Sequence, residues 1–346
     1  MKYLKRFKTH SNYEEYINGG EAVLPNVSYT EDALKVYYNP IPHDYSQDYF
    51  TMVVTVGGDV TWTGTENNTL YYSKDNGTTW SEPSVSITLS VNEGDKVLWK
   101  GEASPTNEGI GTFNDSTDVR YTVEGNVMSL LFGDDFKGQT SLEDKSYAFK
   151  KLFYNNKNIT SVEKLSLPAT TLAKQCYSSM FMGCSSLTTA PELPATTLTD
   201  FCYYYMFSGC SSLVTAPELP ATTLAEDCYY SMLRECSSLV TAPELPATTL
   251  ASTCYSYMFS GCTSLVTAPE LPATTLPVVC YSNMFSGCTN LNYIKCLATD
   301  ISARYCVDDW VKNVASSGTF VKAASMTSWN IGHASGIPDG WTVVDA

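Results

Sequence analysis

A 26-residue repeat fills the second half of the chain and constrains the fold more than any other feature. Two cysteines recur at this spacing in five consecutive copies: Cys176, Cys202, Cys228, Cys254 and Cys280, and Cys184, Cys210, Cys236, Cys262 and Cys288. Degenerate copies flank the five, one beginning at Ala148 and one running through Cys306 to Trp310. Such a period is typical of stacked arrays whose atypical end copies close the exposed surfaces. We therefore expect one structural unit per copy.

Each copy is expected to contain one short helix and one extended segment. Leu224, Cys228, Met232 and Cys236 are four residues apart, which predicts that they share one face of a helix. The stretch from Ser212 to Pro220 contains two prolines and predicts an extended conformation. The expected fold of the repeats is thus an α/β leucine-rich-repeat solenoid with 26-residue repeats.

The repeat unit also resembles a known family. Residues 202–224 read Cys-Tyr-x-x-Met-Phe-x-Gly-Cys-x-Ser-Leu-x-Thr-Ala-Pro-Glu-Leu-Pro-Ala-Thr-Thr-Leu, and over residues 146–310 this pattern resembles BspA-type leucine-rich repeats. That family occurs on surface proteins of Bacteroidetes and related organisms. The chain departs from it in its longer period and in placing Ala-Pro-Glu where the family mostly has an apolar residue.

The two ends of the chain resemble those of structural proteins of phages that infect gut Bacteroidales. The resemblance involves Phe7–His10, Leu24–Ser28 and Tyr38–Pro40 near the start, and Gly318–Lys322 and Gly336–Val343 near the end. It implies a modular virion protein in which an N-terminal piece attaches to other virion proteins and a distal array recognises the host.

The first half of the chain predicts a small antiparallel β-sandwich. Alternating runs such as Phe50–Val56 and Val85–Val91 are separated by turn signals such as Gly57-Gly58 and Asn76-Gly77. The predicted organisation is an N-terminal attachment segment (residues 1–48), a β-sandwich domain (49–127), the leucine-rich-repeat solenoid (128–300) and a C-terminal cap (301–346).

Composition excludes several classes of function. With 36 acidic and 21 basic residues the formal charge is −15, which argues against binding to nucleic acid or to an anionic membrane. Three histidines leave little for metal sites or imidazole catalysis, so we expect no metal, no cofactor and no catalytic residues. No window approaches the ~20 apolar residues of a membrane span. The basic N-terminus lacks the apolar run of a signal peptide.

The cysteines are expected to fill the core as reduced thiols. Cys228 and Cys236 are eight residues apart, which corresponds to ~12 Å along a helix, too far for a disulfide. Their spacing also differs from that of zinc ligands, and no histidine accompanies them as a catalytic base. Disulfides between stacked copies remain geometrically possible.

One motif raises an enzymatic alternative. Ser73, Asp75, Gly77 and Trp80 match the Asp-box of sialidases, in which the motif is a structural turn. Here it occurs once, and we interpret it as a turn. The alternative function is a carbohydrate-active enzyme built on this domain, with its acid pair among residues such as Asp134-Asp135. Adjacent residues on a strand point to opposite faces, however, and make a poor pair.

A column of acidic residues runs along the repeats. Glu192, Glu218, Glu244 and Glu270 occupy the same position of successive copies, whose extended segments are expected ~4.8 Å apart. Recent duplication alone accounts for identical copies. The alternative is a cation or a basic partner bound along the ladder.

A second surface column is aromatic. Tyrosine is constant after the first cysteine of each copy, and the next two positions vary among tyrosine, serine and asparagine, an alphabet typical of binding loops. The alternative is a merely soluble helix face. The predicted ligand-binding residues are Tyr177, Tyr203, Tyr204, Tyr205, Tyr229, Tyr230, Tyr255, Tyr257 and Tyr281.

These observations favour a non-enzymatic structural or adhesion protein, a surface or fibre component of a phage virion. Residues 1–48 would contact other virion structural proteins, and the repeats would bind a host-surface glycan or protein. A homo-oligomer is possible, and the expected location is the virion surface or the extracellular space. A bacterial cell-surface adhesin is a further alternative.

Overall fold

The alternating apolar runs between residues 50 and 126 form β-strands. The computed structural model describes residues 43–346 except 67, 116–117 and 328, so the predicted attachment segment lies outside the described residues up to residue 42. The strands are β1 (Phe50–Val56), β2 (Gly58–Gly64), β3 (Tyr71–Ser73), β4 (Ser86–Val91), β5 (Lys96–Lys100), β6 (Gly111–Phe113) and β7 (Arg120–Asn126). β4, β2 and β6 form one antiparallel sheet, while β3, β5, β1 and β7 pair antiparallel in another.

Aromatic side chains join these two sheets. Phe113 on β6 lies 5.8 Å from Phe50 on β1 and 5.1 Å from Trp99 on β5, measured between ring centroids. On its own sheet it contacts Trp62 at 4.9 Å, and all four side chains are fully buried. The sheets therefore pack face to face around one aromatic cluster.

The larger sheet continues into the repeat region, which corrects the predicted antiparallel sandwich. Strand β8 (Ile159–Ser166) pairs parallel to β7, so this sheet is mixed and crosses the predicted boundary after residue 127. Ile159, Val162 and Leu165 of β8 are buried. The pairing itself has a physical reason, because β8 covers the edge of β7 that would otherwise expose unpaired backbone groups.

The helix predicted in every repeat is absent, and the α/β leucine-rich-repeat solenoid is therefore wrong. Among the described residues the α-helix is a single turn, α2 (Ser129–Phe132), and the 3₁₀-helices are η2 (Tyr45–Gln47) and η3 (Gly133–Phe136). Where helices were expected, the chain forms consecutive turns.

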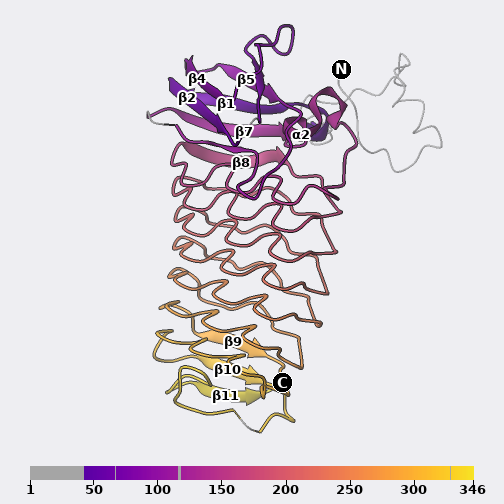
Figure 1. Ribbon diagram of the computed structural model, residues 1–346. Coiled ribbons are helices and arrows are strands. Elements are labelled where there is room, and N and C mark those ends of the chain that lie inside the picture. The colour runs from indigo at the N-terminus through magenta and orange to yellow at the C-terminus, as the bar shows by residue number, and fades with distance from the viewer. Residues whose placement is uncertain (1–42, 67, 116–117, 328) are drawn as a thin grey trace, which may run out of the picture. The chain divides into compact units, whose positions relative to one another are not determined.

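Two kinds of backbone hydrogen bond alternate along these turns. The amide of Cys202 donates to the carbonyl of Thr199, three residues earlier (3.2 Å), whereas the amide of Tyr203 donates to Cys228 in the next copy (3.1 Å). In an α-helix every amide instead donates to the carbonyl four residues earlier. Every second amide thus links one copy to the next, and Figure 1 shows the copies as successive coils between β8 and β9.

A four-residue period explains why these turns imitate a helix in sequence. Every fourth residue has a positive φ, as at Phe201 (+58°), Tyr205 (+55°) and Gly209 (+75°). The backbone therefore repeats after four residues, and side chains four apart point the same way. A helix would drift by ~40° over the same four residues, because each residue advances ~100°. The strict four-residue spacing of buried residues is satisfied better by the turns.

Identical positions of neighbouring coils stack on one another in the core. Phe181 stacks on Phe207 with centroids 5.5 Å apart, and Tyr177 stacks on Tyr203 at 5.7 Å. The thiol of Cys210 donates to the carbonyl of Phe181 in the preceding coil (3.1 Å). All twelve cysteines are buried free thiols, in agreement with the core-filling role predicted for them.

A parallel sheet covers the C-terminal end of the coils. It contains β9 (Tyr293–Cys296), β10 (Thr319–Lys322) and β11 (Thr342–Asp345) in the order β11-β10-β9. Beside it Trp310, which follows Met284 by one period, stacks on Trp329 at 5.5 Å. Bulky side chains thus replace the next coil at this end.

Candidate functional site

The constant tyrosines of the repeats do not form a surface. Their side chains are at most 2% exposed, and they stack inside the coils with centroids 5.7–6.1 Å apart. The turn backbone directs this position inward, whereas a helix with the expected face would have turned it outward. The prediction that these residues contact a ligand is therefore wrong for Tyr177, Tyr203, Tyr229, Tyr255 and Tyr281.

The variable tyrosines lie at the surface and gather in one place. Tyr204 stacks on Tyr230 of the next coil, with centroids 5.0 Å apart and ring planes 16° apart. Tyr205 meets both rings, at 4.5 Å and 5.4 Å, and Tyr257 lies 5.8 Å from Tyr230. Phe201 contacts Tyr204 edge-on at 5.5 Å. We call these five partly exposed residues the tyrosine patch.

The coil backbone fixes the positions of these rings. The amide of Tyr204 donates to the carbonyl of Phe201 (3.2 Å), and the amide of Tyr205 donates to the carbonyl of Tyr230 (2.9 Å). Each of these side chains is therefore attached to a hydrogen-bonded backbone. The patch is confined to three coils, because the neighbouring coils carry Ser178-Ser179 and Ser282-Asn283 at the same positions.

The hydroxyl groups of Tyr204 and Tyr230 remain protonated at neutral pH. Burial, with the neighbouring Tyr205 and Asp227, raises the pKa of Tyr204 to about 12. Burial and contact with Tyr205 also raise the pKa of Tyr230. A neutral phenol both donates and accepts hydrogen bonds. The patch therefore combines aromatic faces with uncharged polar groups.

Two cations border the tyrosine patch. The ammonium group of Lys174 lies 5.4 Å from the ring centre of Phe201, and the guanidinium of Arg234 lies 5.9 Å from that of Tyr257. Arg234 is also paired with Glu235 at 2.8 Å. Both cations thus rest on rings and help to hold them in place.

Sequence reasoning missed Phe201 as a member of the patch. Its position holds Gln175, Asp227, Thr253 or Val279 in the other full copies. An aromatic residue at a position that varies among copies, next to a pair of tyrosines, was the signal that could have found it.

The acidic ladder is exposed, as expected of surface residues, at Glu192, Glu218, Glu244 and Glu270. Glu270 pairs with Lys295 at 2.9 Å. The part of the chain that the structure describes contains no group of three or more acidic, histidine or cysteine side chains arranged to hold a metal ion. Nothing in the ladder thus converges on a cation.

The Asp-box residues form a tight turn after β3. Asp75 accepts hydrogen bonds from the amide of Thr79 (2.9 Å), the hydroxyl of Thr79 (2.6 Å) and the hydroxyl of Ser73 (2.7 Å), while Ser73 accepts one from the amide of Gly77 (2.9 Å). These bonds, above all those from Thr79, lower the pKa of Asp75 to about 2. Trp80 packs against Tyr49 at 5.0 Å. This geometry agrees with a structural turn.

The acid pair required by the enzymatic alternative does not form at Asp134. Its carboxylate accepts hydrogen bonds from Lys100 (2.7 and 2.9 Å) and from the hydroxyl of Tyr49 (2.7 Å). These bonds lower the pKa of Asp134, so the group stays ionised at neutral pH. A carboxylate held in this way is a poor general acid.

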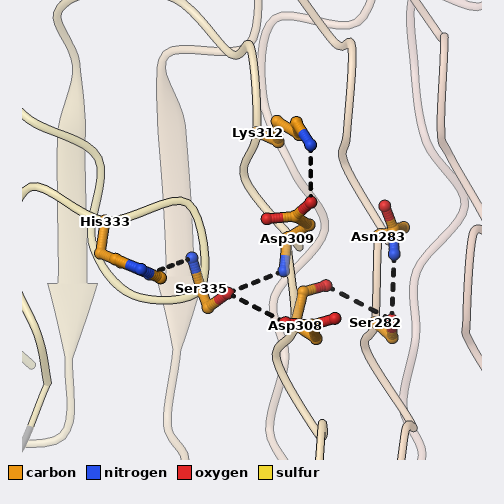
Figure 2. A network of polar contacts seen from close by, with 7 residues as sticks. All are labelled: Ser282, Asn283, Asp308, Asp309, Lys312, His333 and Ser335. Carbon is orange, nitrogen blue, oxygen red and sulfur yellow. Dashed lines mark hydrogen bonds and ion pairs between the residues drawn. The ribbon is translucent and has the colours of Figure 1, made fainter.

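A polar network and a shallow pocket lie at the C-terminal end of the coils. Figure 2 shows Ser335 between two coil residues and His333: its hydroxyl donates to Asp308 (3.3 Å), and it accepts from the amide of Asp309 (2.9 Å). The amide of Ser335 donates to Nδ1 of His333 (3.0 Å). A pocket of about 270 Å³ adjoins Lys312 and His333. Because these polar groups bind one another, the network ties the tail to the last coils.

Comparisons with known proteins add no family to this picture. No helix in the described ranges has the length and apolar character needed to cross a membrane. No protein-family model matches the chain, and searches of curated proteins and of solved structures found no match.

Proposed function

We propose that the protein is a non-enzymatic structural and adhesion protein, a surface or fibre component of a phage virion, whose coils bind a ligand on the host surface. The tyrosine patch is the observation that carries this proposal. Rigid aromatic side chains with uncharged hydroxyl groups give a large contact area at low entropic cost, which is the property that binding loops exploit. At the two variable positions of the repeat, tyrosine occurs in three adjacent coils and not in the coils on either side, which supports a dedicated recognition surface.

The virion assignment rests on the resemblance of the chain ends to phage structural proteins. In this proposal residues 1–48 attach the protein, as a homo-oligomer, to other virion proteins, and the protein reaches the extracellular space with the virion. A bacterial surface adhesin would use the tyrosine patch in the same way, so the binding experiment serves both settings.

A non-enzymatic role is supported by how the candidate carboxylates are used. Asp75 is bonded within its turn, and Asp134 is paired with Lys100. Neither is placed to donate a proton to a substrate.

The proposal is tested by measuring binding of the labelled full chain to a panel of gut Bacteroidales strains. The informative protein is the double variant Tyr204→Ser with Tyr230→Ser. Serine is compatible with the coil, because it occupies the equivalent position of the other full copies as Ser178, Ser256 and Ser282. Tyr154→Ser, an exposed tyrosine outside the patch, is the matched control. We expect binding that the double variant loses and the control retains. Equal binding by all three proteins would refute the proposal.

A further inference from the structure

The chemistry around the tyrosine patch also indicates what it binds. Resting on the proposed function, we infer that the ligand of the tyrosine patch is a neutral saccharide, and not a protein or an acidic glycan. Three features of the described residues carry this inference: the size of the patch, the chemistry of its groups and the charges beside it.

The size of the tyrosine patch suits a small ligand. An aromatic side chain offers ~150–250 Å² in total, and these five are partly covered, so together they present a few hundred Å². A stable protein partner needs ~800 Å² on each side. The patch is bounded by serine-bearing coils on both sides, so its aromatic surface does not extend further along the repeats. A ligand of a few sugar rings fits this area better than a protein surface.

The groups of the tyrosine patch match the two kinds of surface on a sugar. A sugar ring has faces of C–H groups, which pack on aromatic rings, and edges of hydroxyl groups, which both donate and accept hydrogen bonds. Tyr204, Tyr205 and Tyr230 supply rings within 4.5–5.4 Å of one another. Their phenols also donate and accept. The patch thus offers complementary groups without requiring a charge on the ligand.

The charges beside the patch disfavour an acidic sugar. Asp200 and Glu226 are exposed on adjacent coils, directly before Phe201 and Asp227. The carboxylate of Asp227 is close enough to Tyr204 to contribute to its raised pKa. Burial, with smaller contributions from Glu226 and Asp200, raises the pKa of Asp227 itself, so the three carboxylates share one region.

The nearby cations do not outweigh the negative charge beside the tyrosine patch. Arg234 is paired with Glu235, and Lys312, which interacts electrostatically with Tyr257, is paired with Asp309. Among the described residues that border the patch, Lys174 is thus the cation that opposes the three carboxylates around Tyr204. An anionic ligand at the tyrosine patch would therefore meet a negative field, while a neutral one would be indifferent to it.

The experiment compares neutral oligosaccharides (gluco-, galacto-, manno- and xylo-oligosaccharides) with sialylated and uronate-containing ones on an array. We expect the full chain to bind members of the neutral set, and Tyr204→Ser with Tyr230→Ser to weaken this binding by ~10-fold or more, the loss of two ring contacts. The control Tyr154→Ser should bind like the parent chain. The double variant Asp200→Asn with Glu226→Gln should leave neutral binding unchanged and improve any residual binding to acidic sugars.

A cell-based arm separates failure of this inference from failure of the proposed function. Host cells are treated with periodate, which cleaves the vicinal diols of glycans, or with protease. Binding that is lost after periodate supports the saccharide. Binding that depends on the tyrosine patch but survives periodate and is lost after protease would overturn the saccharide and leave the adhesion function intact, as would a preference for acidic sugars. Binding that ignores the patch substitutions would overturn both.

Discussion

The β-sheets of the first half and the coils of the second half bury their side chains with different periods, two residues in the strands and four in the turns. In the sheets, alternation such as that of Phe50, Met52 and Val54 reports which side of a strand faces the core, and the structure buries these residues. In the coils, a four-residue spacing reports only that side chains four apart point the same way. Helices and consecutive turns share that property, so spacing alone does not distinguish them.

The backbone hydrogen bonds distinguish the coils from helices, which the four-residue spacing does not. A helix satisfies its amides within itself, whereas the amide of Tyr203 donates to Cys228 in the next coil. The repeated coils thus hold one another's backbones, and their stability depends on neighbours of identical sequence. The sheets depend instead on contacts such as that of Phe113 with Trp99 between unlike segments. Three experiments exploit this difference.

The largest expected effect is selective loss of the coils at alkaline pH. All cysteines of the chain lie at or after Cys176, and burial raises the pKa of Cys176, Cys254 and Cys288 to about 12. A thiol whose pKa is higher in the folded state stabilises the fold fully below its unfolded pKa of ~8.5 and loses this contribution as the pH rises toward 12. Each buried thiol then costs roughly 1.4 kcal/mol per pH unit within that interval.

The measurement is urea unfolding at pH 7, 8.5 and 10. Near-ultraviolet signals of the sheet tryptophans monitor the sheets, and thiol titration monitors the coils. We expect the thiols to become reactive at lower urea as the pH rises, while the signal of the β1–β7 region changes less. An equal loss in both regions would show that the coils and the sheets unfold as one unit. Native protein whose thiols react readily at pH 8 would contradict their burial.

The next largest effect compares one ring from each region. Phe113→Ala and Phe207→Ala each remove a fully buried ring, and each should cost ~3–5 kcal/mol of unfolding free energy. Phe113 joins two sheets, so its loss should reduce protection of amides in β1, β5 and β6 together. Phe207 stacks on Phe181 of the adjacent coil, so its loss should be felt mainly by the coils beside it.

Hydrogen exchange of the Phe113→Ala and Phe207→Ala proteins shows whether the sheets and the coils lose protection together. A Phe207→Ala protein whose β1 and β5 amides exchange as fast as those of Phe113→Ala would show that the array and the sheets are one cooperative unit. Local loss in the coils, with the sheets protected, would support nearest-neighbour coupling.

The same distinction shows how far the candidate site could be predicted. The variable tyrosines, such as Tyr204 and Tyr230, were identified from their variation on a repeated background, and the structure leaves both partly exposed. The constant Tyr203 was misassigned because its direction depends on backbone conformation, which the repeat pattern does not report. Phe201 was missed although its position also varies among the copies, and the turn geometry brings its ring onto Tyr204.

The smallest expected effect tests the backbone itself, at Val279. This β-branched residue has a φ of +61°, a conformation that costs ~1–2 kcal/mol in L-residues and little in glycine. Glycine loses ~0.5–1 kcal/mol more in conformational entropy, so Val279→Gly should be neutral or raise the free energy of unfolding by up to ~1.5 kcal/mol. In a helix the same substitution would lower it by a similar amount.

The sign of this change therefore separates consecutive turns from a helix, and Val278→Gly supplies the matched control. Val278 is exposed and has no positive φ, so its substitution should be destabilising in either conformation. Both variants are compared with the parent chain by thermal and urea unfolding. If Val279→Gly destabilises the protein as much as Val278→Gly does, the positive φ at every fourth residue is wrong. The inward direction of Tyr203 and the grouping of the tyrosine patch would then also be wrong, because both follow from the four-residue turn period.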